Sequence, residues 1–298
     1  MAVTAAMVKN LREISGAGMS ACKEALVEAN GDIERAQDIL REKGLAAAAK
    51  KAGRVAAEGV VFAKLDEIKG VLLEVNSETD FVAKNSEFTD FVSELAEVAL
   101  NNLYGSVEDL LDGNAKTGAK VKDALSEKIA LIGENINIRR LRLMTCELGE
   151  ELFSYIHGNG RVGVILKLKC DVVNEAVREA GKNLCMQIAA MSPKYVARAD
   201  IPQSFIDSER EIFVQLAINE GRDPKIAEKV VAGRLEKHLK SLCLLEQEYV
   251  KEDKLTCAAY LKNIGGVSAV DFARYETGEG IEKKVEDFAE EVNKVIKG

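Results

Sequence analysis

The sequence has few of the residues that break helices or fill aromatic cores. It contains three prolines and no tryptophan, and aromatic residues make up 5% of it. Long helices and mainly aliphatic cores are therefore expected, because proline interrupts helices and is rare here. The 298 residues are 47% hydrophobic and 30% charged, a composition typical of a globular protein with one large domain or a few small ones.

The sequence also lacks an excess of positive charge. Its formal net charge is −8, and Lys and Arg are dispersed among Asp and Glu. Nucleic-acid affinity depends largely on neutralising phosphates, so direct binding of DNA or RNA is not expected. No apolar run approaches membrane-spanning length, and the first ten residues resemble neither a secretion signal nor a transit peptide. We therefore expect a cytoplasmic protein without a membrane partner.

Patterns that would support catalysis or metal binding are missing. The six cysteines form no C-x-x-C pair, so free thiols are expected rather than a zinc site or disulfides. His157 and His238 have no Cys, Asp or Glu at metal-ligand spacing. No nucleophile, base and orienting group can be assembled. We expect neither metal nor cofactor, and a binding protein is favoured over an enzyme.

Two stretches imitate the dinucleotide-binding fingerprint. Residues 16–21 fit G-x-G-x-x-A, and residues 158–163 fit G-x-G-x-x-G. The fingerprint works where a strand turns into a helix, because the first amides of the helix hold the pyrophosphate. The first stretch lies between two expected helices and the second between two expected strands. Neither is therefore predicted to bind a nucleotide.

The first fifty residues are expected to form three short helices. Thr4 is a candidate cap for the first, Ser20 for the second, and Asn30-Gly31 ends the second. A helical linker, GLAAAAKKAGR, is expected to follow. Apolar residues at helical spacing predict a small core: Leu11, Ile14, Ala25, Leu26, Ile33, Ala36, Ile39 and Leu40. Such a bundle is only marginally stable, and its exposed apolar residues are expected to contact a partner.

From Val55 the hydrophobic period becomes that of strands. GVVFAKL and GVLLEVN predict a hairpin, followed by a helix from about Asp80 to Leu100, the helix AKVKDALSEKIALIG and the strand NINIRRLRLMTCEL. ELFSYIH and RVGVILKLKC predict a second hairpin, and the helix after it stops at Pro193. The expected fold class is α+β, with a two-part core built on antiparallel sheets. No sequence repeat between the halves is apparent.

Residues 204–245 predict two long amphipathic helices in an antiparallel pair. Phe205, Ile212 and Leu216 are expected to face Ile226, Val230 and Leu242. Such a protruding pair is typical of an interaction arm or a dimer contact. We expect residues 1–54 to form the bundle and linker, and residues 55–145 to form the first part of the core. Residues 146–200 together with 243–270 are expected to form the second part. Residues 201–242 are expected to form the arm, and 271–298 a C-terminal module with a final helix.

The stretch SETDFVAKNSEF leaves two interpretations open for Asp80-Phe81. Phe81 precedes Phe88 by seven residues, so a continuous helix would place both on one face, packed in the core. Asp80 or Thr79 would then be the N-cap. Alternatively, Phe81 lies in a first turn that overhangs the sheet, where its ring is free to reach a partner.

Five segments resemble the bacterial elongation factor Ts family in the same order and at similar spacing. They are LREISGAGMSACKEALVEANGDIERAQDILREKG, SETDFVAKNSEF, IGENINIRR, YIHGNGRVGV and ARYETGEGIEK, and the similarity runs from Val8 nearly to the end. The resemblance implies a guanine-nucleotide exchange factor for elongation factor Tu, a GTPase. It also implies a bundle like the ubiquitin-associated domain that docks on the GTPase domain, an arm that serves dimerisation in some members, and a C-terminal helix that returns to Tu.

The resemblance also assigns roles to particular residues. It implies that Asp80, Phe81, Val82 and Ala83 form a helix tip beside the Mg²⁺ site of Tu. It implies contacts with Tu at Leu11, Arg12, Gly18, Met19, Cys22, Lys23, Thr79, Ile132, Gly133, His157, Tyr249 and Val250. The segment 247–250 departs from the family, which usually has Gln-Pro-Phe-Val there, so the backbone restraint of a proline is absent and Glu248 adds a charge. An adaptor without exchange activity is the alternative function, and an enzyme is a more distant one.

Overall fold

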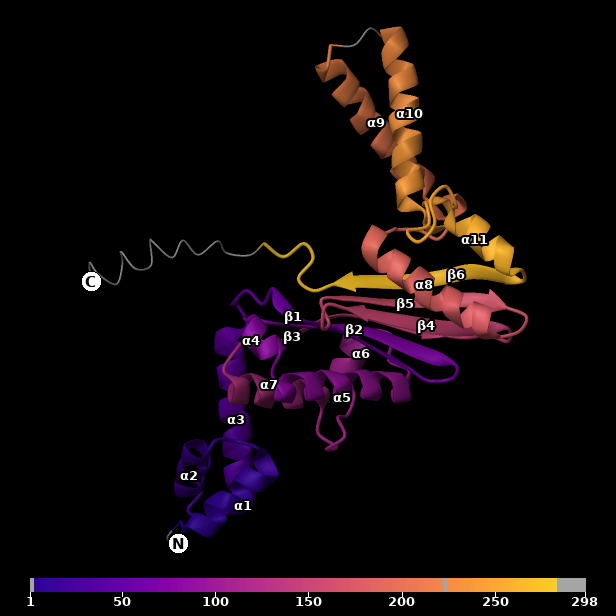
Figure 1. Ribbon diagram of the computed structural model, residues 1–298. Coiled ribbons are helices and arrows are strands. Elements are labelled where there is room, and N and C mark those ends of the chain that lie inside the picture. The colour runs from indigo at the N-terminus through magenta and orange to yellow at the C-terminus, as the bar shows by residue number, and fades with distance from the viewer. Residues whose placement is uncertain (1–2, 222–223, 283–298) are drawn as a thin grey trace. The chain divides into compact units, whose positions relative to one another are not determined.

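The computed structural model describes residues 3–221 and 224–282 (Figure 1). These residues form an α+β fold with two three-stranded antiparallel sheets, as predicted. The chain divides into two compact units. Among the described residues, one contains 3–62, 73–142 and 276–282. The other contains 63–72, 143–221 and 224–275. Both units are therefore discontinuous in sequence, and the hairpin of the first sheet contributes to both.

Three helices open the first unit: α1 (Ala5–Ser15), α2 (Met19–Glu28) and α3 (Ile33–Lys51). The side chain of Thr4 caps α1, as predicted, by accepting a hydrogen bond from the amide of Met7. The prediction for Ser20 was wrong. Helix α2 begins at Met19 after Gly18, and the Ser20 hydroxyl donates instead to Glu24 at 3.1 Å. Asn30 and Gly31 then reverse the chain with φ angles of 53° and 86°.

The small core of this bundle follows most of the predicted stripe. Ile14 is the exception, because its side chain is 55% exposed. The expected third helix and most of the expected helical linker form one helix, which continues through Gly44 to Lys51. Gly44 lies against Ser126 and Ala130 of α7, which explains why a residue without a side chain is found there. The buried bundle residues are Val8, Leu11, Cys22, Ala25, Leu26, Ala29, Ala36 and Ile39.

The first sheet has the order β1 (Glu58–Leu65), β2 (Lys69–Ser77) and β3 (Asn137–Thr145). Its helices are α4 (Asp80–Ala83), α5 (Ser86–Asn102), α6 (Val107–Asp112) and α7 (Val121–Ile132). Helices α5 and α7 lie on one side of the sheet in Figure 1. The predicted stripe of α5 is buried: Phe88, Phe91, Val92, Leu95 and Val98.

The single helix expected from Asp80 to Leu100 is in fact two. Helix α4 ends at Ala83, and α5 begins at Ser86. Asn85 separates them because its side-chain oxygen accepts the amide of Glu87 at 2.8 Å and so caps α5. A residue in α4 therefore does not continue the buried stripe of α5.

A buried carboxylate fastens the C-terminal segment to this sheet. Glu74 is fully buried on β2 and accepts hydrogen bonds from Arg139 Nη1 at 3.0 Å and from the amide of Gly278 at 2.8 Å. Arg140 also donates to Glu74, and its Nη2 reaches the carbonyl of Glu276 at 3.0 Å. Side chains of β2 and β3 thus hold the C-terminal segment, which begins at residue 276.

The second sheet has the order β4 (Glu150–His157), β5 (Val162–Cys170) and β6 (Val267–Glu276). Strands β4 and β5 form the predicted hairpin, in a register that runs from the Glu150–Lys169 pair to the His157–Val162 pair. Strand β6 was not predicted, and it crosses the boundary expected at residue 270. Helix α8 (Glu175–Met191) packs on β4 and β5, and its N-cap is Asn174.

The core of this unit lies between β5, α8 and α11 (Cys257–Ile264). It includes Leu166 and Leu168 of β5 and Leu184 and Ile188 of α8. Gly181 of α8 lies against the ring of Phe153, so a larger residue there would overlap with the ring. All six cysteines are free, and five of them are buried.

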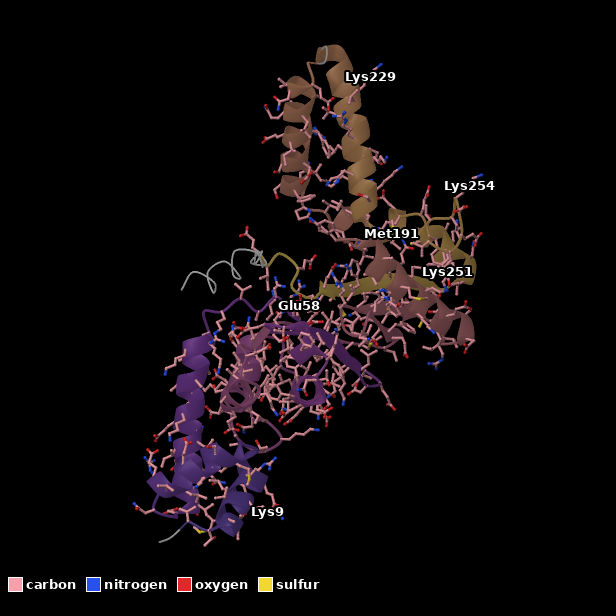
Figure 2. All side chains as sticks on the ribbon, turned by 60° about the vertical axis from the view of Figure 1, so that its left-hand side comes forward. Lys9, Glu58, Met191, Lys229, Lys251 and Lys254 are labelled. Carbon is pink, nitrogen blue, oxygen red and sulfur yellow. The ribbon has the colours of Figure 1, made fainter. Side chains whose placement is uncertain are left out.

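Helices α9 (Gln203–Asn219) and α10 (Pro224–Leu242) form the predicted antiparallel pair. The pair projects from the rest of its unit (Figure 1), and side chains of both helices extend into the space between them (Figure 2). Ile212 and Leu216 were expected on the inner face of the pair. This prediction was wrong, because their side chains are 49% and 45% exposed. The residues that face inwards are Phe205, Ile206, Phe213 and Ala217 on α9 and Val231, Leu235 and Leu239 on α10.

Three further expectations concern the ends of these elements. The side chain of Ile226 lies outside the described residues. A final helix was expected from residue 281, and apart from residues 281 and 282 it also lies outside them. Leu242 is buried, as expected, and Val230 is half-buried. Among residues 3–221 and 224–282, no helix combines the length and the apolar character needed to cross a membrane.

Candidate partner-binding site

The segment Asp80–Phe81 forms an exposed tip at the end of a buried strand. Residues 71–77 of β2 are all buried, and the chain leaves the sheet at Glu78. Helix α4 follows at once and has only four residues. The ring of Phe81 is 81% exposed, whereas Ala83, two residues on, is buried. Core packing of Phe81, the first of the two interpretations, is therefore wrong.

Thr79 caps this tip, and Asp80 does not. The Thr79 hydroxyl accepts the amide of Val82 at 3.3 Å, with the extended backbone of an N-cap residue. The Asp80 carboxylate instead accepts from Lys84 Nζ at 2.6 Å. This hydrogen bond, supported by the charge of Lys84, holds the pKa of the Asp80 carboxyl below its ordinary value. Asp80 is therefore an exposed, ionised group beside the Phe81 ring.

A second loop of the same unit holds the tip from behind. Helix α7 ends at Ile132, and its C-cap residue Gly133 has a φ of 87°, which suits glycine and turns the chain towards Thr79. Glu134 then accepts hydrogen bonds from the amides of Glu78 at 3.1 Å and Thr79 at 3.0 Å, and from the Thr79 hydroxyl at 2.6 Å. The structure thus brings together three predicted positions, Thr79, Ile132 and Gly133.

Sequence reasoning missed Glu134, although it lies in the quoted segment IGENINIRR. An acid directly after a helix-ending glycine is a common surface residue, and nothing in the sequence reveals which amides it meets. Thr79, 55 positions earlier in the chain, supplies the hydroxyl that this carboxylate accepts. Only the tertiary structure identifies such a pair.

The bundle presents some of its predicted contact residues and buries others. Arg12, Gly18 and Lys23 are exposed, and Met19 is 54% exposed. Leu11 and Cys22 are completely buried in the bundle core. These two side chains therefore shape the surface formed by α1 and α2, and they do not lie on it.

The remaining predicted contacts belong to the second unit. His157 is exposed at the end of β4, and its Nδ1 lies 2.9 Å from the Tyr155 hydroxyl. Val250 is 50% exposed, whereas Tyr249 is only 5% exposed and stacks on Tyr260 with ring centroids 4.3 Å apart. Burial raises the pKa of the Tyr249 hydroxyl. Tyr249 is thus a core residue, and Val250 carries the exposed surface of this segment.

A buried amide fixes the backbone at Val250. Gln187 of α8 is fully buried, and its side-chain oxygen accepts the amide of Val250 at 2.9 Å. Its Nε2 donates to the carbonyl of Glu248 at 3.1 Å and to Gln247 Oε1 at 3.1 Å. These bonds hold the segment 247–250 in place. Lys251, labelled in Figure 2, follows Val250 and donates to Asn183 at 2.7 Å.

The two glycine-rich stretches have the local structures expected of them. Gly16 and Gly18 lie between helices α1 and α2. Gly158, Asn159 and Gly160 form the turn between β4 and β5, with φ angles of 59°, 54° and 94°. In the part of the chain that the structure describes, no cluster of three His, Cys, Asp or Glu could hold a metal ion.

An exposed aromatic ring on an anchored tip, with exposed residues on a helical bundle, is typical of a protein that acts by binding another macromolecule. Comparison with known families identifies the group. The family model for "Elongation factor TS" matches residues 78–279. The chain therefore belongs to the elongation factor Ts family, whose members are translation elongation factors and not catalysts.

Individual relatives agree with the family assignment over nearly the whole chain. The chain is 48% identical over 300 residues to an elongation factor Ts of Clostridium acetobutylicum, with 98% of each chain covered. It is 47% identical to one of Clostridium perfringens, covering 98% of this chain and 99% of that one. It is 46% identical to one of Clostridioides difficile, with 99% of both covered.

Proposed function

We propose that this protein is a guanine-nucleotide exchange factor for elongation factor Tu and acts by promoting the release of GDP. Membership of the elongation factor Ts family supports a role in translation elongation. The observation that carries the exchange mechanism is the 81% exposed ring of Phe81 beside the ionised Asp80. A protein of this function works in the cytoplasm and needs no direct contact with nucleic acid.

Exchange requires differential binding and no covalent chemistry. A GTPase holds its nucleotide through amides around the phosphates and through a bound Mg²⁺. The factor must bind the nucleotide-free form more tightly than the loaded form. By thermodynamic linkage, the factor weakens nucleotide binding to the same extent that nucleotide weakens binding of the factor.

The Asp80–Phe81 tip suits insertion beside such a site. Burying a Phe ring in a pocket of the partner contributes about 1.5–3 kcal/mol, which corresponds to about one to two powers of ten in affinity. The neighbouring carboxylate of Asp80 would alter the charge balance around a bound cation. Val82 and Ala83 complete the tip, with Ala83 packed inwards as its support.

One aromatic ring is too little for a large acceleration, so further contacts must add to it. The exposed bundle residues Arg12, Gly18, Met19 and Lys23 form one candidate surface. The loop at Ile132-Gly133 adjoins the tip, and His157 and Val250 are exposed in the second unit. We propose that these surfaces bind Tu together with the tip.

The release of a fluorescent GDP analogue from Tu tests the function. Wild-type protein at saturating concentration should accelerate release, and excess GDP should dissociate the complex of the two proteins. An adaptor would bind Tu without changing the release rate. The mass of the complex, measured with and without GDP, separates the two outcomes.

We also propose that exposed apolar side chains of α9 mediate a homodimer. Ile212 and Leu216 lie on one flank of the helix and Val214 and Ile218 on the other, and all four are 39% to 59% exposed. Burying them against a second copy would remove apolar area from water. Sedimentation of the wild type and of Ile212→Glu tests this. A wild type that remains monomeric at high concentration would contradict it.

A further inference from the structure

We infer that Glu134 is a positioning residue that holds the Asp80–Phe81 tip in the orientation required for exchange; this inference rests on the proposed function. Glu134 lies in the loop after α7, outside the tip itself. Its carboxylate accepts three hydrogen bonds from the two residues that precede Asp80, with distances between 2.6 and 3.1 Å. It therefore acts on the tip through the main chain of Glu78 and Thr79 and the Thr79 hydroxyl, and not by touching a partner's nucleotide site.

The tip needs support from outside because it is too short to orient itself. Helix α4 has four residues, and isolated helices of this length do not persist in water. Two of its closing hydrogen bonds are long, at 3.3 Å from Ala83 N to Thr79 O and from Lys84 N to Phe81 O. The ring of Phe81 is 81% exposed and gains little packing from its own chain. Its direction must therefore come from the two ends of α4.

At the far end, Ala83 is buried and Asn85 begins the next helix. At the near end, Glu134 fixes Thr79 on both its main chain and its side chain. The Thr79 hydroxyl donates its proton to Glu134 Oε1 at 2.6 Å, which leaves a lone pair for the amide of Val82 at 3.3 Å. The carboxylate thus sets the direction of the capping interaction that starts α4.

The loop that carries Glu134 is itself held by the segment it supports. Glu78 Oε1 accepts the amide of Asn135 at 2.6 Å, so residues 78–79 and 134–135 exchange hydrogen bonds in both directions. Asn135 is 8% exposed, and its side chain donates to the carbonyl of Arg54 at 2.7 Å. This reciprocal arrangement makes the tip and the α7 loop one structural feature.

The three partners of the Glu134 carboxylate all donate to it. A carboxylate only accepts hydrogen bonds, so it suits these donors. Glu134→Gln would replace one acceptor oxygen by an amide donor, leaving the Thr79 hydroxyl proton without its acceptor. Glu134→Ala would remove all three bonds. The two variants should therefore weaken the positioning to different degrees.

The test measures GDP release from Tu as a function of the concentration of factor. Hydrogen bonds to a charged acceptor are worth about one to two powers of ten, so Glu134→Ala should lower the maximal release rate about tenfold or more. Glu134→Gln should fall between the wild type and Glu134→Ala. The half-saturating concentration should change less, because the other contact surfaces remain.

A double variant shows whether Glu134 acts through the ring. In a Phe81→Ala background, Glu134→Ala should slow release by less than twofold more, because the ring that Glu134 orients is absent. If the two substitutions slowed release by independent factors that multiply in the double variant, the inference would be overturned. A maximal release rate for Glu134→Ala equal to that of the wild type would also overturn it. If the wild type itself fails to accelerate release, the proposed function fails, and the next measurement still tests the positioning.

Amide hydrogen exchange gives a readout that does not depend on Tu. Glu134→Ala should increase exchange at Thr79 and Val82 and leave the core of α5 protected. Glu150→Ala is the matched control, because Glu150 also accepts a backbone amide, from Glu147 at 2.9 Å, but in the other unit. Unchanged protection of Thr79 and Val82 in Glu134→Ala, or a loss of protection throughout the unit, would overturn the positioning role.

Discussion

Phe81 and Phe88 lie seven residues apart on opposite sides of a helix break, and their rings have opposite environments. Phe81 is 81% exposed in α4, and Phe88 is completely buried in α5. We expect Phe81→Ala to change the free energy of unfolding by less than about 0.5 kcal/mol, because the ring packs on little. The same substitution should slow GDP release from Tu by about one to two powers of ten.

Phe88→Ala is the matched control for Phe81→Ala. Removing a fully buried ring should cost about 3–5 kcal/mol of stability. Urea unfolding of both variants, together with their maximal release rates, separates the two roles. A release rate for Phe81→Ala equal to that of the wild type at saturating factor would contradict the wedge mechanism.

The sequence could predict the regular elements because their patterns are local. The strand predicted for GVLLEVN and the helical stripe from Phe88 to Val98 each follow from their own side chains, and both were confirmed. The helix break at Asn85 was missed. The spacing of Phe81 and Phe88 indicated one continuous helix, whereas Asn85 caps a new helix that begins between them. Strand β6 was missed because half-buried residues along most of it leave no clean alternation.

The candidate site could be predicted less completely than the fold. Spacing alone left Phe81 undecided between the core and the surface, because its exposure depends on where α4 ends. Tyr249 and Val250 are neighbours with opposite burial, which depends on Tyr260 stacking on one of them. Glu134 contacts Thr79 across 55 positions, and no single-sequence pattern connects them.

Asp80 should respond to the removal of Lys84. The hydrogen bond from Lys84 is the main reason that the pKa of the Asp80 carboxyl lies below its ordinary value of 3.8. In Lys84→Gln this pKa should rise towards 3.8, which a carbon-13 NMR titration of the carboxyl group can follow. Asp80→Asn should leave the stability almost unchanged, because Thr79 is the cap. A pKa that does not move in Lys84→Gln would show that the ion pair is absent in solution.

The lowered pKa of the buried Glu74 carboxyl predicts that the stability of the protein depends on pH. Burial raises the pKa of this carboxyl, but hydrogen bonds from Gly278 and Asn76 and the charge of Arg140 outweigh burial, so its pKa lies below the ordinary 4.5. Ionised Glu74 therefore stabilises the folded state fully above pH 4.5, and this contribution disappears as the pH falls through the folded-state pKa.

Glu74→Gln should consequently lower the free energy of unfolding by about 3 kcal/mol at pH 7, since it leaves two arginines without their buried partner. The difference from the wild type should stay constant down to about pH 5 and shrink below 4.5. Urea unfolding at several pH values measures it. Exposed Glu67→Gln is the control and should show no such trend. An equal difference at pH 7 and at pH 3.5 would contradict the assignment.

Val250 and Tyr249 provide a test of the second unit. Val250→Ala should change stability by less than about 0.5 kcal/mol, because the side chain is half exposed. Tyr249→Ala should cost about 3–5 kcal/mol, since it removes a buried ring stacked on Tyr260. If Val250 contacts Tu, its substitution should weaken binding to nucleotide-free Tu, measured by calorimetry. Unchanged affinity would remove Val250 from the interface.

Substitutions at Gly278 and Gly280 test whether the contact at residue 278 holds the C-terminal segment on the first sheet. Both have positive φ angles, 71° and 76°, so alanine at either position carries a similar backbone cost of about 1 kcal/mol. They differ in their surroundings. A Cβ at position 278 would overlap with the carbonyl oxygen of Ala57, whereas a Cβ at position 280 meets no atom within 4 Å among the described residues.

Gly278→Ala should therefore displace the segment and lengthen the bond from its amide to Glu74, whereas Gly280→Ala should leave that bond intact. Limited proteolysis between residues 274 and 282 should be faster in Gly278→Ala than in Gly280→Ala. The pKa of Glu74 should rise in Gly278→Ala alone, because this amide is one of the groups that lower it. Equal proteolysis rates in the two variants would show that the backbone angle, and not the contact with β2, determines how the segment is held.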